Sequence, residues 1–272
     1  MNKKILVCYL FTSFDNKQSF INFLKHYKIN TAGADHTLLI CFKLLDKQKI
    51  LFFRNLLKDI RYIEFIDPIL FNDFDFGSYK RVSERYRSHT IFFLNSHSYP
   101  LKKNWLKKLL YHYKEKTLIG TSASNESLLT SLKFKKIHKF FSYLIKLIRY
   151  KKKFKSFPNP HIRTSSFLIK GEDFISFCNS SGIKNKKITN KEDVWFIESG
   201  LKGLTNYFKK KKYNILVINS DGLKFTENNW KFSETYNYLK QSKSLISDKH
   251  TRKYLKLSNQ KRLTTSYNSW GR

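Results

Sequence analysis

Short apolar runs alternate with amphipathic segments along the first half of the chain. Runs of roughly four to eight apolar residues predict strands, whereas apolar residues recurring every three or four positions predict helices. The expected strands cover residues 4–11, 37–44, 62–66, 91–94 and 117–121, and the expected helices cover 17–27, 47–59, 75–86 and 105–113. This order predicts an α/β fold in which helices flank a doubly wound, mostly parallel, twisted sheet.

The second half of the chain is less regular. A basic amphipathic segment at residues 132–155 predicts a helix, which Pro158 and Pro160 end because proline forces extended backbone. Further strands are expected at 165–169 and 214–219, and further helices at 172–178 and 192–208. We expect one domain over residues 1–227, which includes the basic segment, and a helical and irregular C-terminal extension at 228–272 that packs on the same domain.

The composition indicates a folded and strongly basic protein. Of 272 residues, 41% are hydrophobic and 17% aromatic, which favours a packed core over disorder. The formal net charge of +33 favours an anionic partner, such as nucleic acid, anionic lipid or a phosphorylated substrate. A compositional bias that enriches Lys, Asn, Ile, Phe and Tyr together is an alternative explanation of the charge. Nucleic acid is the least expected partner, because no RNA-binding signature, zinc spacing or helix-turn-helix pattern is present.

The cysteines and the lengths of the apolar runs indicate the cellular compartment of the protein. Cys8, Cys41 and Cys178 are far apart and lack ligand spacing, so buried reduced thiols are expected, which suits the cytosol. No segment approaches the roughly 20 apolar residues of a spanning helix. The mixture of lysines and aromatic residues at 132–155 fits either a helix resting on anionic headgroups or a covering helix with a solvated basic face. We expect a cytoplasmic protein, peripheral on the inner face of the membrane under the first interpretation.

Polar side chains follow the apolar strand at 91–94. Asn95, Ser96 and His97 lie where an open α/β sheet binds its ligand, at the carboxyl end of a strand. One helix earlier, the segment from Asp75 to Tyr79 predicts a glycine turn at Gly77. The backbone amides after this turn, with Ser78, suit a phosphate at a helix N-terminus. Asp75 is a candidate ligand of a base or ribose, although helix capping is the commoner use of Asp and Ser.

With these residues the chain resembles inverting glycosyltransferases of the GT-A fold over about residues 4–222, and it looks related to the large family-2 group of such enzymes. In that family an asparagine–glycine turn opens a helix, and an apolar strand follows in the pattern F-L-D-x-D. The corresponding strand here reads Phe93-Leu94-Asn95-Ser96-His97. The chain also looks like uncharacterised bacterial relatives in the segments DFGSY, LNSHS, PNPHIRT and ESG. The resemblance implies a Rossmann-like GT-A fold, a nucleotide-sugar donor and a saccharide or lipid-linked acceptor of cell-envelope polysaccharide biosynthesis.

The metal-binding carboxylates of that pattern are missing here. A departing nucleoside diphosphate develops negative charge, which a divalent cation such as Mg²⁺ or Mn²⁺ usually neutralises. Two alternatives stay open: His97 helps to hold a metal with ligands from elsewhere, or basic side chains replace the metal. We favour the second, because the stiff loop from Pro158 to Thr164 carries His161 and Arg163, and an arginine fork suits a diphosphate.

A carboxylate base is expected at the start of the helix that follows. The resemblance implies that an acidic pair at this place deprotonates the acceptor hydroxyl, which here selects Asp193, with Glu192 as the alternative or orienting partner. Acidic residues in the first turn of a helix also interact favourably with the helix dipole, which is the competing structural explanation. Glu198, farther along the same helix, is expected to brace the site from a different face.

The sequence therefore supports two hypotheses of different class. The first is a glycosyltransferase that binds its donor through Asp75, Gly77, Ser78, Asn95, His97, His161 and Arg163 and uses Asp193 as base. The second is a non-catalytic basic protein on the same scaffold that binds nucleic acid or another polyanion through its lysines.

Overall fold

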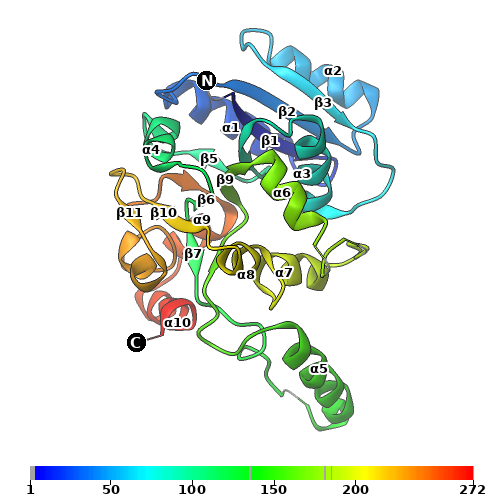
Figure 1. Ribbon diagram of the computed structural model, residues 1–272, viewed down its shortest axis with the longest axis vertical. Helices are drawn as coiled ribbons and strands as arrows, with labels where there is room; N and C mark the ends of the chain where they lie inside the picture. The colour runs from blue at the N-terminus through cyan, green and yellow to red at the C-terminus, as the bar shows by residue number, and fades with distance from the viewer. Residues whose placement is uncertain (1–3, 135, 181, 185, 272) are drawn as a thin grey trace.

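A single large sheet organises the chain. The computed structural model describes residues 4–134, 136–180, 182–184 and 186–271 (Figure 1). In spatial order the sheet consists of β11 (Lys224–Phe225), β10 (Asn214–Ile218), β6 (Thr117–Gly120), β9 (Ser166–Lys170), β4 (Thr90–Leu94), β1 (Ile5–Thr12), β2 (Thr37–Lys43) and β3 (Ile63–Asp67). Strands β9 and β11 run antiparallel to their neighbours, and the other strands are parallel to one another.

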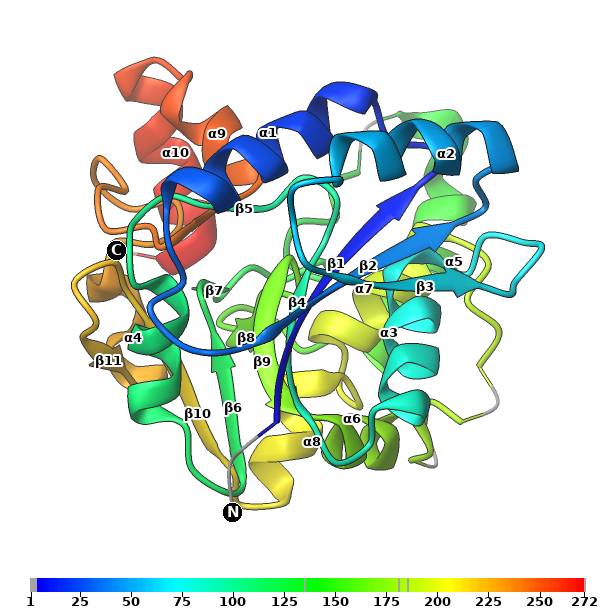
Figure 2. The same ribbon diagram turned by 90° about the horizontal axis from the view of Figure 1, so that it is seen from above.

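Helices cover both faces of this sheet. In chain order, the α-helices of the described residues are α1 (Lys17–Ile29), α2 (Lys47–Leu56), α3 (Phe74–Arg85), α4 (Trp105–His112), α5 (Phe140–Lys153), α6 (Gly171–Cys178), α7 (Lys191–Ser199), α8 (Leu204–Lys210), α9 (Lys249–Leu255) and α10 (Asn259–Trp270). Helix α5 projects away from the sheet (Figure 1). The 3₁₀ helices η1 (Ile137–Lys139) and η2 (Glu227–Ser233) complete the helical part. The predicted α/β class, with a mostly parallel sheet flanked by helices, is confirmed (Figure 2).

Two apolar cores lie on the two faces of the sheet. On β1, Leu6, Cys8 and Leu10 contact the core under α3, α6, α7 and α8, whereas Val7 and Tyr9 contact the core under α1, α2 and α4. Because both faces are covered, the central strands consist of apolar residues without alternation.

The cysteines lie inside these cores. All three are buried free thiols, as predicted from their positions in apolar segments. Burial raises the pKa of each thiol, to about 12 for Cys178. Such thiols stay protonated and unreactive, so their role is packing.

The C-terminal extension is tied into the body of the molecule. Strand β12 (Ile246–Ser247) pairs antiparallel with β5 (Tyr99–Pro100), just beyond the end of β4. Trp230 and Trp270 are buried in the core, and the Trp270 Nε1 donates to the Tyr236 carbonyl oxygen at 2.8 Å. A second small sheet, β7 (Ala123–Ser124) with β8 (His161–Ile162), lies between this extension and the main sheet.

One predicted helix is wrong in extent. The segment 192–208 forms two helices, α7 and α8, because the chain turns away at Gly200 and Gly203. A Cβ atom at Gly200 would lie 2.5 Å from the Phe196 carbonyl oxygen, and one at Gly203 would lie 2.8 Å from the Gly200 nitrogen. Only glycine fits this close turn.

The predicted glycine turn at Asp75–Tyr79 is also wrong, since this segment is already inside α3. Gly77 serves packing there: a Cβ atom at this position would lie 1.8 Å from a carboxylate oxygen of Asp73. Asp73 belongs to a buried network in which the Lys43 ammonium and Arg81 both bind it. Arg81 also donates to Asp67 at 2.6 and 2.7 Å.

The same network connects α3 to the neighbouring strands. Ser78 donates from its hydroxyl to Asp67 at 2.5 Å, so β2, β3 and α3 are connected through two cations and two carboxylates. Lys43 is fully buried, and a buried ammonium is tolerated only with such partners.

Replacement of Gly77 by alanine should destabilise the protein, although alanine is the better helix former. The added methyl group must displace the Asp73 carboxylate, and overpacking of this kind costs about 1–3 kcal/mol. Urea unfolding measures the change in the free energy of unfolding. The control is Lys80→Ala on the same helix, where a surface substitution should stay within about 0.5 kcal/mol. Equal effects of the two substitutions would contradict the packing role of Gly77.

Candidate active site

The carboxyl end of β4 meets the loop that precedes β9. Because β9 is antiparallel, its first residue pairs with Leu94, and the Asn95 backbone N–H donates to the Ser165 carbonyl oxygen at 3.1 Å. The Asn95 side chain closes a turn, since its Oδ1 accepts from the His97 N–H at 3.2 Å and from the Ser98 hydroxyl at 2.8 Å. The structure therefore brings the loop after β4 next to the loop that carries Arg163.

His97 contacts the loop that follows β1. Its Nε2 lies 3.5 Å from Asp15 Oδ1, and its Nδ1 lies 3.3 Å from the Ser19 hydroxyl. Arg252, from α9, donates to the His97 carbonyl oxygen at 3.0 Å. Burial lowers the pKa of His97, with Lys249 and Arg252 adding to the effect and Asp15 opposing it, so the imidazole is neutral near pH 7.

Asp75 is partly buried and lies within range of the charge of Asp15. Burial raises its pKa to about 6, and the charges of Asp15 and Glu198 act in the same direction. No hydrogen bond from the described residues reaches the Asp75 carboxyl group. A buried carboxylate without a hydrogen-bond partner destabilises the folded state when it is ionised. Carboxylates with a raised pKa are concentrated at functional sites.

Arg163 and Asp248 form a buried ion pair. The Arg163 Nη1 lies 2.7 Å from Asp248 Oδ2, and the guanidinium stacks 3.9 Å from the centre of the Tyr236 ring. Asp248 also caps α9, because its Oδ1 accepts from the Thr251 N–H at 2.7 Å. Burial would raise the pKa of Asp248, but Arg163 and the Thr251 N–H hold it well below its usual range. Asp248 is thus ionised and fixes both Arg163 and α9.

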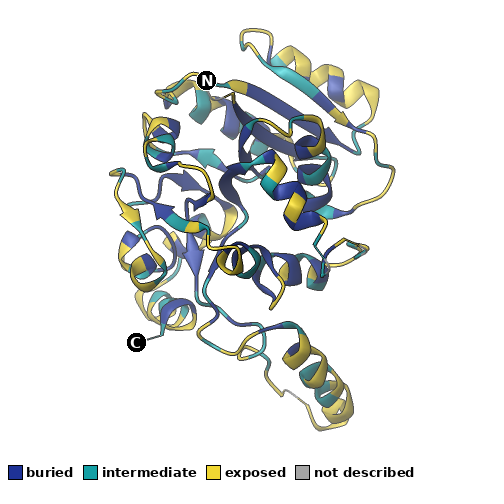
Figure 3. Cartoon of the chain, viewed as in Figure 1, coloured by how far each residue is buried: buried dark blue, intermediate teal, exposed yellow. Residues whose placement is uncertain are grey.

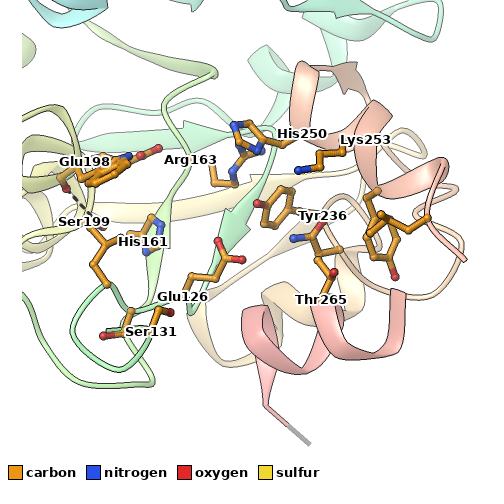
Figure 4. Close-up of a pocket in the computed structure, with 16 residues that line it drawn as sticks. Glu126, Ser131, His161, Arg163, Glu198, Ser199, Tyr236, His250, Lys253 and Thr265 are labelled. Carbon is orange, nitrogen blue, oxygen red and sulfur yellow. Dashed lines mark hydrogen bonds between the residues drawn. The ribbon is translucent and has the colours of Figure 1, made fainter. Parts of the chain in front are cut away.

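A cavity of about 410 Å³ opens beside this ion pair. Figure 4 shows Glu198, Ser199 and His161 on one side of it, and Tyr236, Lys253 and Thr265 on the other. The lining also includes Glu126, Ser127, Leu128, Ser131, Arg163, Trp195, Asn237, His250, Tyr254 and Leu257. Most of these groups are polar. They come from the segment after β7, from β8 and the residue after it, from α7, and from residues 236–265.

Two carboxylates line this cavity, Glu126 and Glu198. Glu126 accepts one hydrogen bond, from the Ser269 hydroxyl at 2.9 Å. The more firmly held of the two is Glu198. Its Oε1 accepts from the Thr164 N–H at 2.8 Å and from the Thr164 hydroxyl at 3.0 Å, which holds the side chain in place. Its Oε2 has no hydrogen-bond partner among the described residues and remains available to a ligand. The charge of Glu198 raises the pKa of both Asp75 and Arg163.

Two imidazoles line the same cavity. His161 donates from Nδ1 to the Asn159 carbonyl oxygen at 2.7 Å, which leaves Nε2 as an acceptor in the neutral ring. Burial lowers the pKa of His250, and the nearby Arg163 adds to this effect. The basic side chains of Arg163 and Lys253 line the cavity as well.

The structure separates Asp193 and Glu192 from this cavity. Asp193 accepts from the Thr189 N–H at 3.1 Å and pairs with Lys186 at 3.0 Å. Burial opposes ionisation of Asp193, but the hydrogen bonds from Lys186 and Thr189 outweigh it and lower the pKa. Glu192 binds two cations of α5, Arg149 at 2.7 Å and Lys153 at 2.6 Å.

The predicted donor-binding residues fall into three places. His161 and Arg163 line the cavity, Asn95, His97 and Asp75 lie at the adjoining edge of the sheet, and Gly77 and Ser78 belong to the buried network under α3.

Sequence reasoning missed Asp248, His250, Lys253 and Tyr236. Around Asp248 the local pattern indicates only a helix cap, which Asp248 indeed is, so the sequence contains no sign of its contact with Arg163.

The residues at the sheet edge do not fit the divalent cation that the resemblance implies. Mg²⁺ and Mn²⁺ prefer several oxygen ligands, whereas His97 and Asp15 offer one imidazole and one carboxylate. Within the described ranges, no group of three or more His, Cys, Asp or Glu side chains is arranged to hold a metal ion.

Comparisons with known proteins return matches among solved structures. No protein-family model and no curated protein matches the chain. The glycosyltransferase GlyE of Streptococcus pneumoniae is 10% identical with a TM-score of 0.49, and the match covers 99% of this chain and 61% of GlyE. This chain therefore spans less than two thirds of that structure. The match to GalNAc-T7, solved with UDP, GalNAc and Mn²⁺, has 8% identity, a TM-score of 0.42, and coverage of 64% and 36%.

A third match is 4-diphosphocytidyl-2C-methyl-D-erythritol synthase of Anaerococcus prevotii. It is 9% identical with a TM-score of 0.48, and the match covers 85% of this chain and 96% of the synthase. These similarities concern the fold and assign no activity to this chain.

Removal of the Asp248 carboxylate should destabilise the protein strongly. Asp248→Ala leaves Arg163 buried without its counter-ion and removes the cap of α9, so we expect a loss of about 3–5 kcal/mol in urea unfolding. The matched control is Asp221→Ala, which breaks an exposed pair with Lys243 and should cost less than about 1 kcal/mol. A small effect at Asp248 would show that the pair does not fix the C-terminal extension.

Asp75→Asn should stabilise the protein at high pH and leave it unchanged at low pH. The folded-state pKa of about 6 lies above the unfolded value of about 4, so the wild type loses stability as pH rises through this interval. At about pH 8 the variant should be about 1–3 kcal/mol more stable in urea unfolding, and below about pH 4 the two should agree. Asp35→Asn, at an exposed position, is the control for the substitution itself. If Asp75→Asn is no more stable than the wild type at pH 8, the pKa of Asp75 is not raised in the folded protein.

Proposed function

We propose that this protein is a glycosyltransferase that moves a sugar from a nucleotide-activated donor to a saccharide or lipid-linked acceptor. The observation that carries the proposal is the Glu198 carboxylate, which is fixed through one oxygen and free at the other in a polar cavity beside Arg163. The resemblance of the DFGSY, LNSHS, PNPHIRT and ESG segments to glycosyltransferases supports the same class.

The chemistry follows from the charges at the cavity. In an inverting transfer, Glu198 Oε2 accepts the proton of the acceptor hydroxyl while the hydroxyl oxygen forms a bond to the anomeric carbon. The bond from that carbon to the nucleoside diphosphate breaks at the same time, and the diphosphate leaves with the electron pair. Arg163 and Lys253 stabilise the developing negative charge. Trp195, partly exposed at the cavity, offers a broad apolar surface to the acceptor.

Glu198 is favoured over Asp193 and Glu192 as the base. A base must reach the proton that it abstracts, and it needs an uncommitted lone pair. Both Asp193 and Glu192 are held by cations and lie outside the cavity lining, whereas Glu198 Oε2 is uncommitted and lies in it.

Glu198→Gln should lower kcat by about 10²–10⁴-fold while donor affinity stays nearly unchanged, because the amide keeps the shape but cannot accept the proton. Asp193→Asn is the matched variant and should retain kcat within a few-fold. Turnover is measured as release of the nucleoside diphosphate, and donor affinity by calorimetry over a panel of nucleotide sugars. A kcat that falls for Asp193→Asn and survives in Glu198→Gln would return the role to Asp193.

The same calorimetry separates this proposal from a basic protein that only binds polyanions. A glycosyltransferase should give heat with at least one nucleotide sugar. A chain that shows no heat with any nucleotide sugar, but binds DNA with a steep dependence on salt, would contradict the transferase.

A further inference from the structure

Helix α5 projects from the body of the molecule, as Figure 1 shows at the lower right. The apolar residues Ile137, Phe141, Ile145 and Ile148 recur at helical spacing along η1 and α5, so they lie on one face. They are 86%, 79%, 66% and 57% exposed, respectively. We call these four residues the apolar stripe. The exposed colouring of Figure 3 covers much of this helix.

The C-terminal end of α5 holds the helix to the protein. Tyr150 is buried there, and Arg149 and Lys153 pair with Glu192 at the start of α7. These contacts fix the helix so that the apolar stripe faces outward. A stripe of large exposed apolar side chains on a fixed helix marks a surface that binds a partner.

The charge around the stripe is of one sign. Between Glu126 and Glu172 the chain has no acidic residue, and residues 127–155 contain ten lysines and arginines. Lys133, Lys136, Lys139, Lys151 and Lys152 are exposed. The first two precede the stripe along the chain, Lys139 lies within it, and the last two follow it. The partner must therefore present negative charge over a broad area together with an apolar interior.

We propose that the apolar stripe and its flanking lysines dock on an anionic lipid bilayer. A bilayer surface satisfies both requirements, since headgroup phosphates receive the ammonium groups while isoleucine and phenylalanine enter the acyl boundary. Nucleic acid would take the lysines but leave the apolar stripe in water. The helix lies on the surface and does not span it, because no helix among the described residues is both long and apolar enough to cross a membrane.

The docking helix is close to the candidate active site along the chain. Ser127, Leu128 and Ser131 line the cavity, and the chain continues from them into η1 and α5. A bilayer under α5 would thus lie near the cavity, which suits a lipid-linked acceptor. This last step rests on the proposed function, whereas the docking itself does not.

Sedimentation with lipid vesicles tests the docking without any measurement of activity. The purified protein is mixed with vesicles of phosphatidylcholine alone, or of phosphatidylcholine with phosphatidylglycerol. We expect binding to the mixed vesicles that weakens as salt is raised, and much weaker binding to the neutral ones. In the double variant Phe141→Glu/Ile145→Glu, binding should fall roughly tenfold or more, because both side chains are excluded from the acyl region.

A second variant tests the charge, and a control tests specificity. For Lys151→Glu/Lys152→Glu we expect at least roughly a 25-fold loss of binding to the mixed vesicles. Leu70→Glu/Leu263→Glu replaces side chains that are 94% and 73% exposed elsewhere, and it should bind like the wild type. Circular dichroism and the unfolding midpoint establish that each variant is folded.

Three results would overturn the proposal. They are wild-type binding by both α5 variants, equal binding of the protein to neutral and mixed vesicles, and a stripe-dependent dimer in solution with no vesicle binding. Failure of the transferase reaction, with vesicle binding intact, would refute the proposed function and leave the docking in place.

Discussion

The buried pair between Arg163 and Asp248 is the interaction on which the candidate active site depends. It connects the loop before β9 to the first turn of α9, which lie 85 residues apart in the chain. Two ions taken out of water are stable only with good geometry and further hydrogen bonds. Here the Thr251 N–H donates to Asp248, and the Arg163 guanidinium stacks on the Tyr236 ring. Without this pair, neither the guanidinium nor the extension would have a defined position at the cavity.

The acidic side chains that were considered for the site differ in how many hydrogen bonds and ion pairs they make. Asp248, Asp193 and Glu192 are bound by cations, and this makes them structural. Glu198 is fixed through one oxygen only, and no hydrogen bond from the described residues reaches the Asp75 carboxyl group. Groups that are positioned but not satisfied are available for substrate. The raised pKa of Asp75 is a stability cost, which is common where a fold carries a reactive site.

Basic residues have two distinct uses in this protein. Lys43, Arg81 and Arg163 are buried with carboxylate partners and hold elements together. The lysines around α5 have no acidic neighbours in sequence and surround an exposed apolar stripe. The net positive charge of the chain is therefore divided between buried ion pairs and exposed lysines. Around α5, exposed lysines lie beside exposed apolar side chains that water solvates poorly.

The sequence by itself determined the α/β class and the order of most elements, since apolar runs such as residues 91–94 and helical periodicities such as residues 17–27 are local properties. It also indicated the loop from Pro158 to Thr164, where prolines and polar residues concentrate. The tertiary structure alone decided that Gly77 lies inside a helix, because the Asp73 carboxylate beside it belongs to a network assembled from three elements. It likewise decided that Glu198 faces the cavity while Asp193 faces Lys186. Both residues lie on α7, and only the packing of that helix against distant segments determines which carboxylate is bound by a cation and which remains free.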